Sequence, residues 1–287
     1  MRVLIIGASG QLGSALRHTF ADHTLLTPGH GELDISQPQA IGAIRELAPD
    51  LVLLPGAYTN VDGCALDPER AFRENTLGPK YVALACAKRD VPLVYVSTNE
   101  VFSGTATTAY REYDQPGPIN AYGRSKWGGE QAVLQHAPTA LVARVAWLFG
   151  GPRNFIRTIL RLADQQSATG QPLQVVDDEV GSPTYTPDAA VAIRQLADAA
   201  VPGIYHIVNA GQCSRYELAC AALHSAAIAA PIVRITSAHF ARPSTPPAYT
   251  PLLNGAAAAL GITLRPWQSA VEEYVGCLLY TSDAADE

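Results

Sequence analysis

The chain opens with MRVLIIGASGQLG, residues 1–13, in which a short apolar run leads directly into three glycines. Val3–Ile6 has the composition of a buried strand, and the residues after it show the apolar spacing of a helix. Gly7, Gly10 and Gly13 allow a tight turn, close approach of a pyrophosphate and close packing of helix on strand. A glycine-rich turn also occurs as a plain connection. Placed between a strand and a helix, where free N–H groups meet a phosphate, it predicts a dinucleotide site.

Strand-like and helix-like segments alternate through the first half of the chain. The expected strands after the first are Asp50–Leu54, Leu93–Ser97 and Ala140–Ala146. The expected helices are Gln11–Phe20, Glu69–Lys88 and Ala121–Gln135. Short strands separated by helices imply parallel strands joined by crossover helices. The sequence therefore predicts an α/β fold built on a Rossmann-type doubly wound parallel sheet.

The second half of the chain has a different composition. Prolines are frequent from Pro152 to Pro251, and shorter strands are expected at Leu173–Val176 and Ile204–Val208. No flexible linker separates the halves. We therefore expect residues 1–150 to form the dinucleotide-binding domain, and residues 151–275 to form a smaller C-terminal substrate-binding lobe partly interleaved with it. Residues 276–287 fit no helix or strand pattern and are interpreted as a polar tail, with an appended non-native sequence as an alternative.

Tyr122 and Lys126 stand four residues apart in a segment with helical spacing, so their side chains share one face of the helix. A lysine there favours the phenolate and lowers the pKa of the tyrosine, which suits a general acid that protonates a carbonyl oxygen. Thr98 follows a buried strand at the edge where such sheets bind ligands, and its hydroxyl would hold the carbonyl. A surface Tyr/Lys pair and a strand-end hydrogen bond are the structural alternatives. Together with the glycine turn, the three residues predict a catalytic set.

The choice of cofactor depends on the residues after the second strand. An acid there would bind the ribose hydroxyls of NAD, but residues 25–30 read LLTPGH, with neither an acid nor an arginine. Asp34 comes slightly later and would border the adenine, or cap the next helix as a loop carboxylate. We expect NADPH as the cofactor, with NADH tolerated.

Composition and charge argue against several other classes of protein. Apolar residues make up 48% of the 287 residues and charged residues 16%, as in a globular enzyme. A formal net charge of -6 without basic runs argues against nucleic acid or an acidic membrane surface as partner. The opening apolar run is too short to span a membrane. The five cysteines are dispersed and the histidines lack metal-ligand spacing, so we expect reduced thiols, no metal site and a cytoplasmic location.

The glycine turn, the strand-end Ser97-Thr98 and the YxxxK spacing resemble the extended short-chain dehydrogenase/reductase family, and finer motifs resemble its dTDP-4-dehydrorhamnose reductase branch. These motifs run along most of the chain, to about Trp267. They are Gly10–Gly13, Gly56–Asp62, Ser97-Thr98 with Val101-Phe102, Tyr122–Lys126 with Gly129-Glu130, Arg144 with Trp147, Asn154-Phe155, Gly181–Thr184 and Gly203–His206. The early motifs are typical of the whole family, whereas the Trp147 and 181–184 segments are more specific to the branch.

The resemblance implies an NAD(P)H-dependent oxidoreductase that reduces a nucleotide-linked 4-keto-6-deoxy sugar, in the first instance dTDP-4-dehydro-L-rhamnose to dTDP-L-rhamnose. Thr98 and Tyr122 would grip the keto oxygen, and Lys126 would also hold the nicotinamide ribose. The residues expected to bind the cofactor are Gly7, Gly10, Gln11, Leu12, Gly13, Asp34, Ile35, Gly56, Ala57, Tyr58, Tyr122 and Lys126. The residues expected to bind the substrate are Thr98, Asn99, Trp147 and Arg242. Trp147 would pack on the sugar ring or serve as a core tryptophan, and Arg242 would meet a nucleotide phosphate or stay an exposed loop arginine.

One departure from the branch leaves alternatives open. The branch commonly has Asp-Tyr after the catalytic threonine, whereas this chain has Asn99-Glu100. An acid at Glu100 also resembles the related sugar-nucleotide dehydratases, although Asn99 leaves the chain one acid short of their pattern. A sugar-nucleotide epimerase or dehydratase is therefore one alternative. A non-catalytic nucleotide-binding regulatory subunit, as found among relatives of the branch, is the other, and a homodimer is one expected state.

Overall fold

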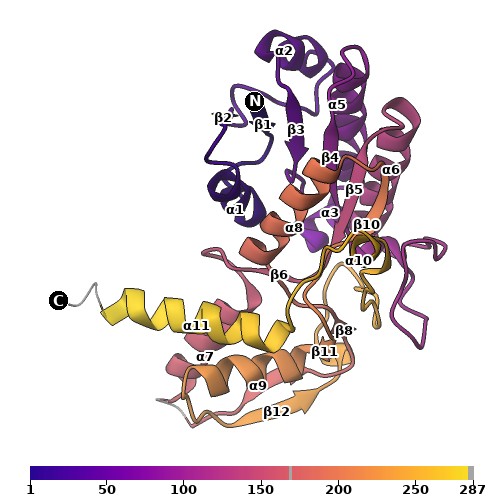
Figure 1. Ribbon diagram of the computed structural model, residues 1–287. Coiled ribbons are helices and arrows are strands. Elements are labelled where there is room, and N and C mark those ends of the chain that lie inside the picture. Colours follow the sequence, from indigo (N-terminus) through magenta and orange to yellow (C-terminus); the bar gives the residue numbers. More distant parts are fainter. Residues whose placement is uncertain (168–169, 284–287) are drawn as a thin grey trace.

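The computed structural model describes residues 1–167 and 170–283, and its largest element is a six-stranded sheet (Figure 1). All neighbouring strands run parallel. In spatial order they are β10 (Gly203–His206), β5 (Leu141–Val145), β4 (Leu93–Thr98), β3 (Leu51–Leu54), β1 (Arg2–Ile5) and β2 (Thr24–Leu26). The chain passes from β1 to β2 on one side and then crosses to β3 on the other, so the carboxyl end of β1 is the switch point where such sheets bind ligands. The predicted Rossmann-type doubly wound parallel sheet is confirmed.

Helices cover both faces of this sheet (Figure 1). One face carries α1 (Gln11–Thr19), α8 (Thr186–Ala199) and α10 (Gly255–Ala259). The other carries α2 (Ala40–Leu47), α5 (Gly78–Ala87) and α6 (Ala121–His136). Because both faces are covered, all four residues of β3 are buried, as expected for a parallel strand rich in leucine and valine. Each such side chain contributes roughly 1.5–3 kcal/mol by leaving water.

The segment predicted as one helix over Glu69–Lys88 contains a wider turn. It comprises α4 (Pro68–Phe72), a π-helical turn η1 (Arg73–Leu77) and α5, and the short α3 (Val61–Leu66) precedes it. Pro79 has no N–H to donate to the carbonyl of Asn75, so the regular α-helical bond is missing there. The Asn75 carbonyl instead accepts the Tyr95 hydroxyl at 3.5 Å. Such π turns occur frequently at functional sites, and this one directs Asn75 inward.

A smaller lobe lies below the sheet in the view of Figure 1. Its helices are α7 (Phe155–Ser167), α9 (Arg215–Ser225) and α11 (Trp267–Asp283). Its strands are β6 (Leu148–Phe149), β7 (Leu173–Val176), β8 (Val180–Gly181), β9 (Thr184–Tyr185), β11 (Cys213–Ser214) and β12 (Ile232–Ile235), with short 3₁₀ turns η2 (Asn99–Val101) and η3 (Ser237–His239) elsewhere. Although β10, α8 and α10 come after residue 150, they belong to the sheet layer. The domain boundary at residue 150 stays a prediction.

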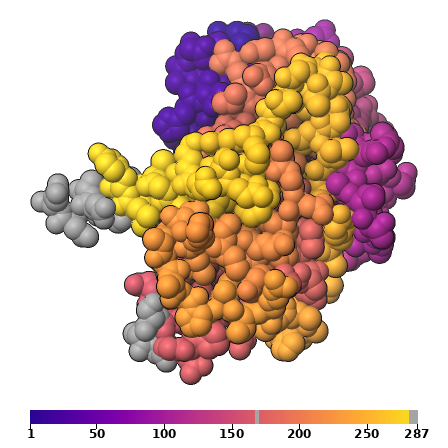
Figure 2. All heavy atoms as spheres, turned by 60° about the horizontal axis from the view of Figure 1, so that its bottom comes forward, coloured from indigo at the N-terminus to yellow at the C-terminus, as the bar shows by residue number. Residues whose placement is uncertain are grey.

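The expectation of an irregular tail after residue 275 is wrong for residues 276–283, which continue helix α11. Tyr274 and Val275 are buried in the core of the lobe, and Leu278 packs against the same cluster one turn later. This packing extends the helix beyond the point where its sequence pattern fades. Figure 2 shows α11, in yellow, running across the surface between the N-terminal part and the orange lobe. Residues 284–287 lie outside the described residues.

Three further features concern membrane-spanning helices, metal ligands and cysteines. Within residues 1–167 and 170–283, no helix is long and apolar enough to cross a membrane. In that same part of the chain, no three His, Cys, Asp or Glu side chains gather as potential ligands of a metal ion. Cys64, Cys86 and Cys213 are buried free thiols.

Candidate cofactor and active site

A cavity of about 700 Å³ opens at the carboxyl ends of β1 and β3, next to the start of α1. Nine of the residues predicted to bind the cofactor line it. They are Gly7, Gly10, Gln11, Leu12, Gly13, Asp34, Ile35, Gly56 and Ala57. The sequence therefore indicated the glycine turn and part of the remaining wall, but it did not indicate Arg153, which reaches the cavity from beyond the sheet.

The wall around the glycine turn has the shape and charge that a pyrophosphate requires. Gly7 has φ of +93°, and a Cβ on it would lie 2.5 Å from the Cα of Gly56. A Cβ on Gly13 would overlap the carbonyl oxygen of Gly7, so α1 can pack this closely only with glycine. No side chain caps the N-terminus of α1, and no acid lies in its first turn. Its free N–H groups therefore suit an anion, and the residues present fit a dinucleotide.

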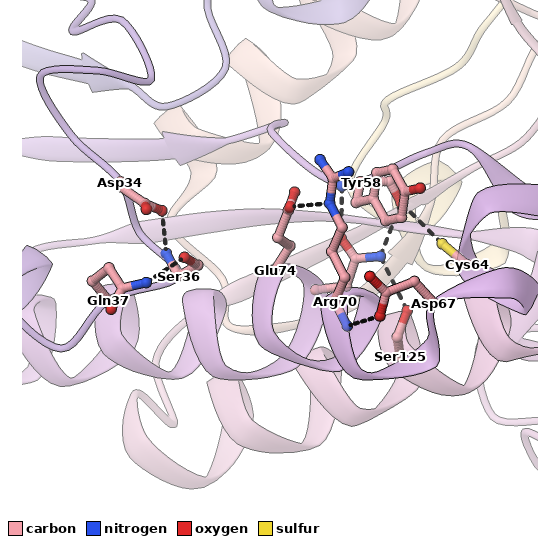
Figure 3. A network of polar contacts seen from close by, with 10 residues as sticks. Asp34, Ser36, Gln37, Tyr58, Cys64, Asp67, Arg70, Glu74 and Ser125 are labelled. Carbon is pink, nitrogen blue, oxygen red and sulfur yellow. Dashed lines mark hydrogen bonds and ion pairs between the residues drawn. The ribbon is translucent and has the colours of Figure 1, made fainter.

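Tyr58 is not part of the cavity wall, but the structure holds its backbone firmly (Figure 3). Its N–H donates to Asn75 Oδ1 at 2.8 Å, and its carbonyl accepts from Asn75 Nδ2 at 3.0 Å. The same amide nitrogen donates to Ser125 Oγ at 3.0 Å, on the helix that carries Tyr122 and Lys126. Asn75 therefore joins the loop after β3 to the catalytic helix. Sequence reasoning missed it, because the contacts span 17 and 50 residues of chain.

The three predicted catalytic side chains are all buried at the carboxyl end of β4. Thr98 is the last residue of that strand, and its hydroxyl lies near enough to the Tyr122 phenol to oppose the rise in the pKa of that phenol. Helix α6 begins at Ala121 because the Asn120 side chain accepts the N–H of Gly123 at 2.8 Å. Tyr122 therefore lies in the first turn of the helix and Lys126 one turn further on. The structure brings Thr98 and Tyr122 together, as the sequence predicted.

The predicted lowering of the Tyr122 pKa by Lys126 is wrong. Burial raises the pKa of the Tyr122 phenol, the nearby Glu100 carboxylate raises it further, and the Thr98 hydroxyl only partly offsets this. Lys126 acts elsewhere, since its Nζ donates to the Val96 carbonyl at 2.7 Å and lies 4.2 Å from the centre of the Tyr95 ring. Tyr122 is accordingly a protonated phenol, the form that a general acid needs.

Lys126 gives the folded protein a specific pH dependence. Burial lowers the pKa of Lys126 from 10.5 to about 7, although the Glu130 carboxylate opposes the shift. Above that folded pKa the amine is neutral in the folded protein, while in the unfolded chain it stays protonated up to its ordinary pKa. The unfolded state then binds more protons, so the Lys126 contribution makes the free energy of unfolding rise with pH across this window.

The test is urea unfolding at the two ends of this window. We expect the free energy of unfolding to rise more with pH in the wild-type protein than in Lys126→Met, whereas Lys88→Met at an exposed position should behave like the wild type. Equal rises in the wild type and Lys126→Met would contradict the assignment of a buried, neutral amine.

Asn99 and Glu100 support the threonine and the tyrosine in different ways. Asn99 Oδ1 accepts the Thr98 hydroxyl at 3.2 Å, and its Nδ2 donates to Thr250 Oγ1 at 2.7 Å. Glu100 accepts the Nδ2–H of Asn120 at 2.7 Å, and burial raises the pKa of its carboxyl group. Asn99 thus orients Thr98 from the lobe side, while its predicted contact with substrate stays a prediction. The position of Glu100 beside Tyr122 was not foreseen from the sequence.

A second cavity, of about 830 Å³, lies in the lobe between α7 and the segment 237–246. Arg215 and Glu179 line it, with 3.6 Å between the Nε of the arginine and a carboxylate oxygen of the glutamate. The Arg215 guanidinium also lies 3.6 Å from the centre of the Trp147 ring. Trp147 does not line either cavity, and an arginine covers its ring where a sugar was expected. The predicted contact between Trp147 and the sugar stays a prediction.

Arg242 lines the second cavity, as a residue that meets a substrate phosphate would. Its Nε donates to Asp62 Oδ1 at 3.0 Å, and the N–H of Ser244 donates to the same oxygen at 3.2 Å. The pair is about one-third exposed on each side, so it is accessible to solvent. The partner of Arg242 is therefore the Asp62 carboxylate of α3. The two residues are 180 positions apart in the chain, and the sequence did not reveal the pair.

Most of the chain matches the model of a known family. The model of the RmlD substrate binding domain family matches residues 1–279. The chain belongs to this family. A dTDP-4-dehydrorhamnose reductase from Mycolicibacterium smegmatis is 38% identical over 286 residues, covering 97% of this chain and 86% of the relative. The resemblance to the dTDP-4-dehydrorhamnose reductase family is thereby confirmed.

Solved structures of this family have the same fold. A dTDP-4-dehydrorhamnose reductase from Clostridium acetobutylicum superposes with a TM-score of 0.92 at 32% identity, covering 97% of this chain and 100% of that one. The enzyme of that name from Bacillus anthracis, in complex with NADP, superposes with a TM-score of 0.90 at 31% identity, covering 95% and 98%. The expectations of a reductase and of NADPH agree with the names and the cofactor of these relatives.

Proposed function

We propose that this member of the RmlD substrate binding domain family is an NADPH-dependent reductase of a nucleotide-linked 4-keto-6-deoxy sugar, with dTDP-4-dehydro-L-rhamnose as substrate. The observation that carries the proposal is the pairing of Thr98 with Tyr122 at the end of β4, one strand away from the dinucleotide cavity. The carboxyl edge of the sheet thereby offers a phosphate cradle and a buried proton donor side by side. NADH would be tolerated, because residues 27–30, directly after β2, include neither an acid nor an arginine to select between the two cofactors.

The catalytic residues would divide the work between orientation and proton transfer. The bound cofactor supplies the hydride for the keto carbon of the sugar. The single O–H of Thr98, which donates to Asn99 in this structure, would turn to the keto oxygen, and Tyr122 would give that oxygen its phenolic proton. The phenolate left behind is a buried anion, which burial disfavours. It would therefore take up a proton from solvent or from a protonated Lys126 one helical turn away, and this restores the acid.

The second cavity would take the nucleotide part of the substrate. It lies in the lobe and contains two guanidinium groups, from Arg215 and Arg242, among largely apolar residues. The Arg215 guanidinium has five N–H donors, so it would bind a diphosphate while it keeps its ion pair with Glu179. Glu100 interacts electrostatically with both arginines and also raises the pKa of Tyr122, so it lies where the two parts of a substrate would meet.

The test is the loss of the reduced-nicotinamide absorbance when NADPH and dTDP-4-dehydro-L-rhamnose are added together. We expect oxidation that requires the sugar, is slower or weaker with NADH, and is absent with dTDP-rhamnose as a control. No oxidation despite measurable NADPH binding would favour the regulatory-subunit alternative.

The epimerase or dehydratase alternative has its own signature. Such enzymes retain their cofactor through the catalytic cycle, whereas a reductase must exchange it. Denaturing the purified protein should therefore release little NAD, and stoichiometric NAD would favour the alternative. A homodimer and a cytoplasmic location stay predictions.

A further inference from the structure

The cavity at the glycine turn has an uneven distribution of charge. Among the described residues that line it, Arg153 is the only lysine or arginine. The two lining acids already have partners, since Asp34 Oδ1 accepts the N–H of Ser36 at 2.9 Å and Glu74 Oε1 accepts Arg70 Nε at 2.7 Å (Figure 3). Arg153 is exposed and makes no hydrogen bond or ion pair with any part of the chain that the structure describes. One cationic side chain therefore remains available to an anion in this cavity.

The backbone before Arg153 is fixed against the start of α1. The N–H of Gly151 donates to Gln11 Oε1 at 3.2 Å, and a Cβ on Gly151 would lie 2.5 Å from Gln11 Cγ. The carbonyl of Gly151 accepts hydrogen bonds from Asn154 Nδ2 at 2.7 Å and from the Tyr274 hydroxyl at 2.8 Å. Contacts from α1, from Asn154 directly before α7, and from α11 thus hold Gly151 in place, and Arg153 follows two residues later. The backbone at Arg153 is therefore anchored beside the glycine turn at the start of α1, and not beside the end of β2.

We infer that Arg153 binds the pyrophosphate of the dinucleotide from the side opposite the glycine turn. The free N–H groups of α1 would face one side of the diphosphate, and the guanidinium would form charge-assisted hydrogen bonds on the other. The cofactor would then be held between the sheet domain and a segment anchored to the lobe. This inference rests on the proposed function, because it requires the cavity to bind a dinucleotide.

The location of Arg153 favours the pyrophosphate of the dinucleotide over the 2′-phosphate of NADPH. Thr27 and His30 line the cavity after β2, on the side of the adenine ribose, where a 2′-phosphate would lie. Gly151, by contrast, touches the first residue of α1, beside the pyrophosphate position. A pyrophosphate contact is common to NADPH and NADH, whereas a 2′-phosphate contact is present only in NADPH. The two cofactors therefore distinguish the sites.

The experiment measures the dissociation constants of NADPH and NADH by cofactor fluorescence, without sugar, for the wild-type protein and for Arg153→Gln. We expect both constants to rise by the same factor, about tenfold or more, as for the loss of a hydrogen bond to a charged group. Arg157→Gln is the matched control. Arg157 lies in the first turn of α7, is exposed and does not line the cavity. It should leave both constants unchanged.

Two results would overturn the inference. A loss of affinity confined to NADPH would place Arg153 at the 2′-phosphate, and unchanged constants for both cofactors would make it a solvated surface arginine. If the wild-type protein bound neither cofactor, the proposed function itself would fail. Wild-type binding together with an unaffected Arg153→Gln variant would refute this inference alone.

Discussion

The variant Tyr122→Phe is expected to lower turnover with the keto sugar by about 10²–10⁴-fold, the usual cost of losing a general acid. The phenol is 8% exposed and its pKa is raised by burial, so it is a proton donor that solvent cannot easily replace. Tyr122 does not line the cavity that contains the glycine turn and Arg153, so the affinity for NADPH should stay the same. Steady-state rates combined with direct NADPH titration would check both expectations.

A matched substitution separates this role from a general effect of removing a phenol. Tyr113 is 75% exposed, and Tyr113→Phe should keep wild-type turnover. If Tyr122→Phe retained the wild-type rate, Tyr122 would not be the acid. If it lost NADPH binding as well, the tyrosine would be part of the cofactor site and its catalytic role would be unproven.

The variant Arg144→Met is expected to destabilise the fold by about 3–5 kcal/mol, because it leaves a buried carboxylate without its counter-ion. Arg144 on β5 and Glu130 on α6 are 1% and 2% exposed. They form two parallel hydrogen bonds, from Nε to Oε1 at 2.8 Å and from Nη2 to Oε2 at 2.7 Å. This pair fixes the catalytic helix against the sheet. Urea unfolding of the wild type and the variant would measure the loss.

The double variant Arg144→Met/Glu130→Met is the control for this prediction. It removes both charges and replaces them with apolar side chains, so most of the lost stability should return. A double variant as unstable as the single one would show that packing, and not the unpaired charge, dominates. A single variant as stable as the wild type would contradict the account.

The sequence predicted features that depend on local patterns. The glycine turn, the Thr98 strand end and the Tyr122/Lys126 helix face each lie within a few residues of chain, and apolar alternation with helix spacing was enough to place them. The same holds for the strand predicted at Leu173–Val176, whose observed bounds are identical. Local sequence patterns therefore suffice for the glycine turn and for the helix face that carries Tyr122 and Lys126.

Features that depend on distant contacts were beyond the sequence. The direction of the Lys126 amine depends on Val96 and Tyr95, and burial together with Glu100 sets the state of Tyr122. Arg215 covers the Trp147 ring only because α9 packs against the segment after β5. The last turns of α11 lack a clear apolar pattern and are helical because the preceding turns are packed. A single sequence carries no direct record of such pairings.

The most direct test of the central claim is the fate of the hydride. NADPH deuterated at the reactive position of the nicotinamide would be incubated with dTDP-4-dehydro-L-rhamnose, and the product would be examined by mass spectrometry and NMR. The account predicts one deuterium on the new carbinol carbon at position 4 of the sugar, and almost none with Tyr122→Phe over the same time. Deuterium at any other carbon, or no transfer by a wild-type protein that binds both ligands, would contradict it.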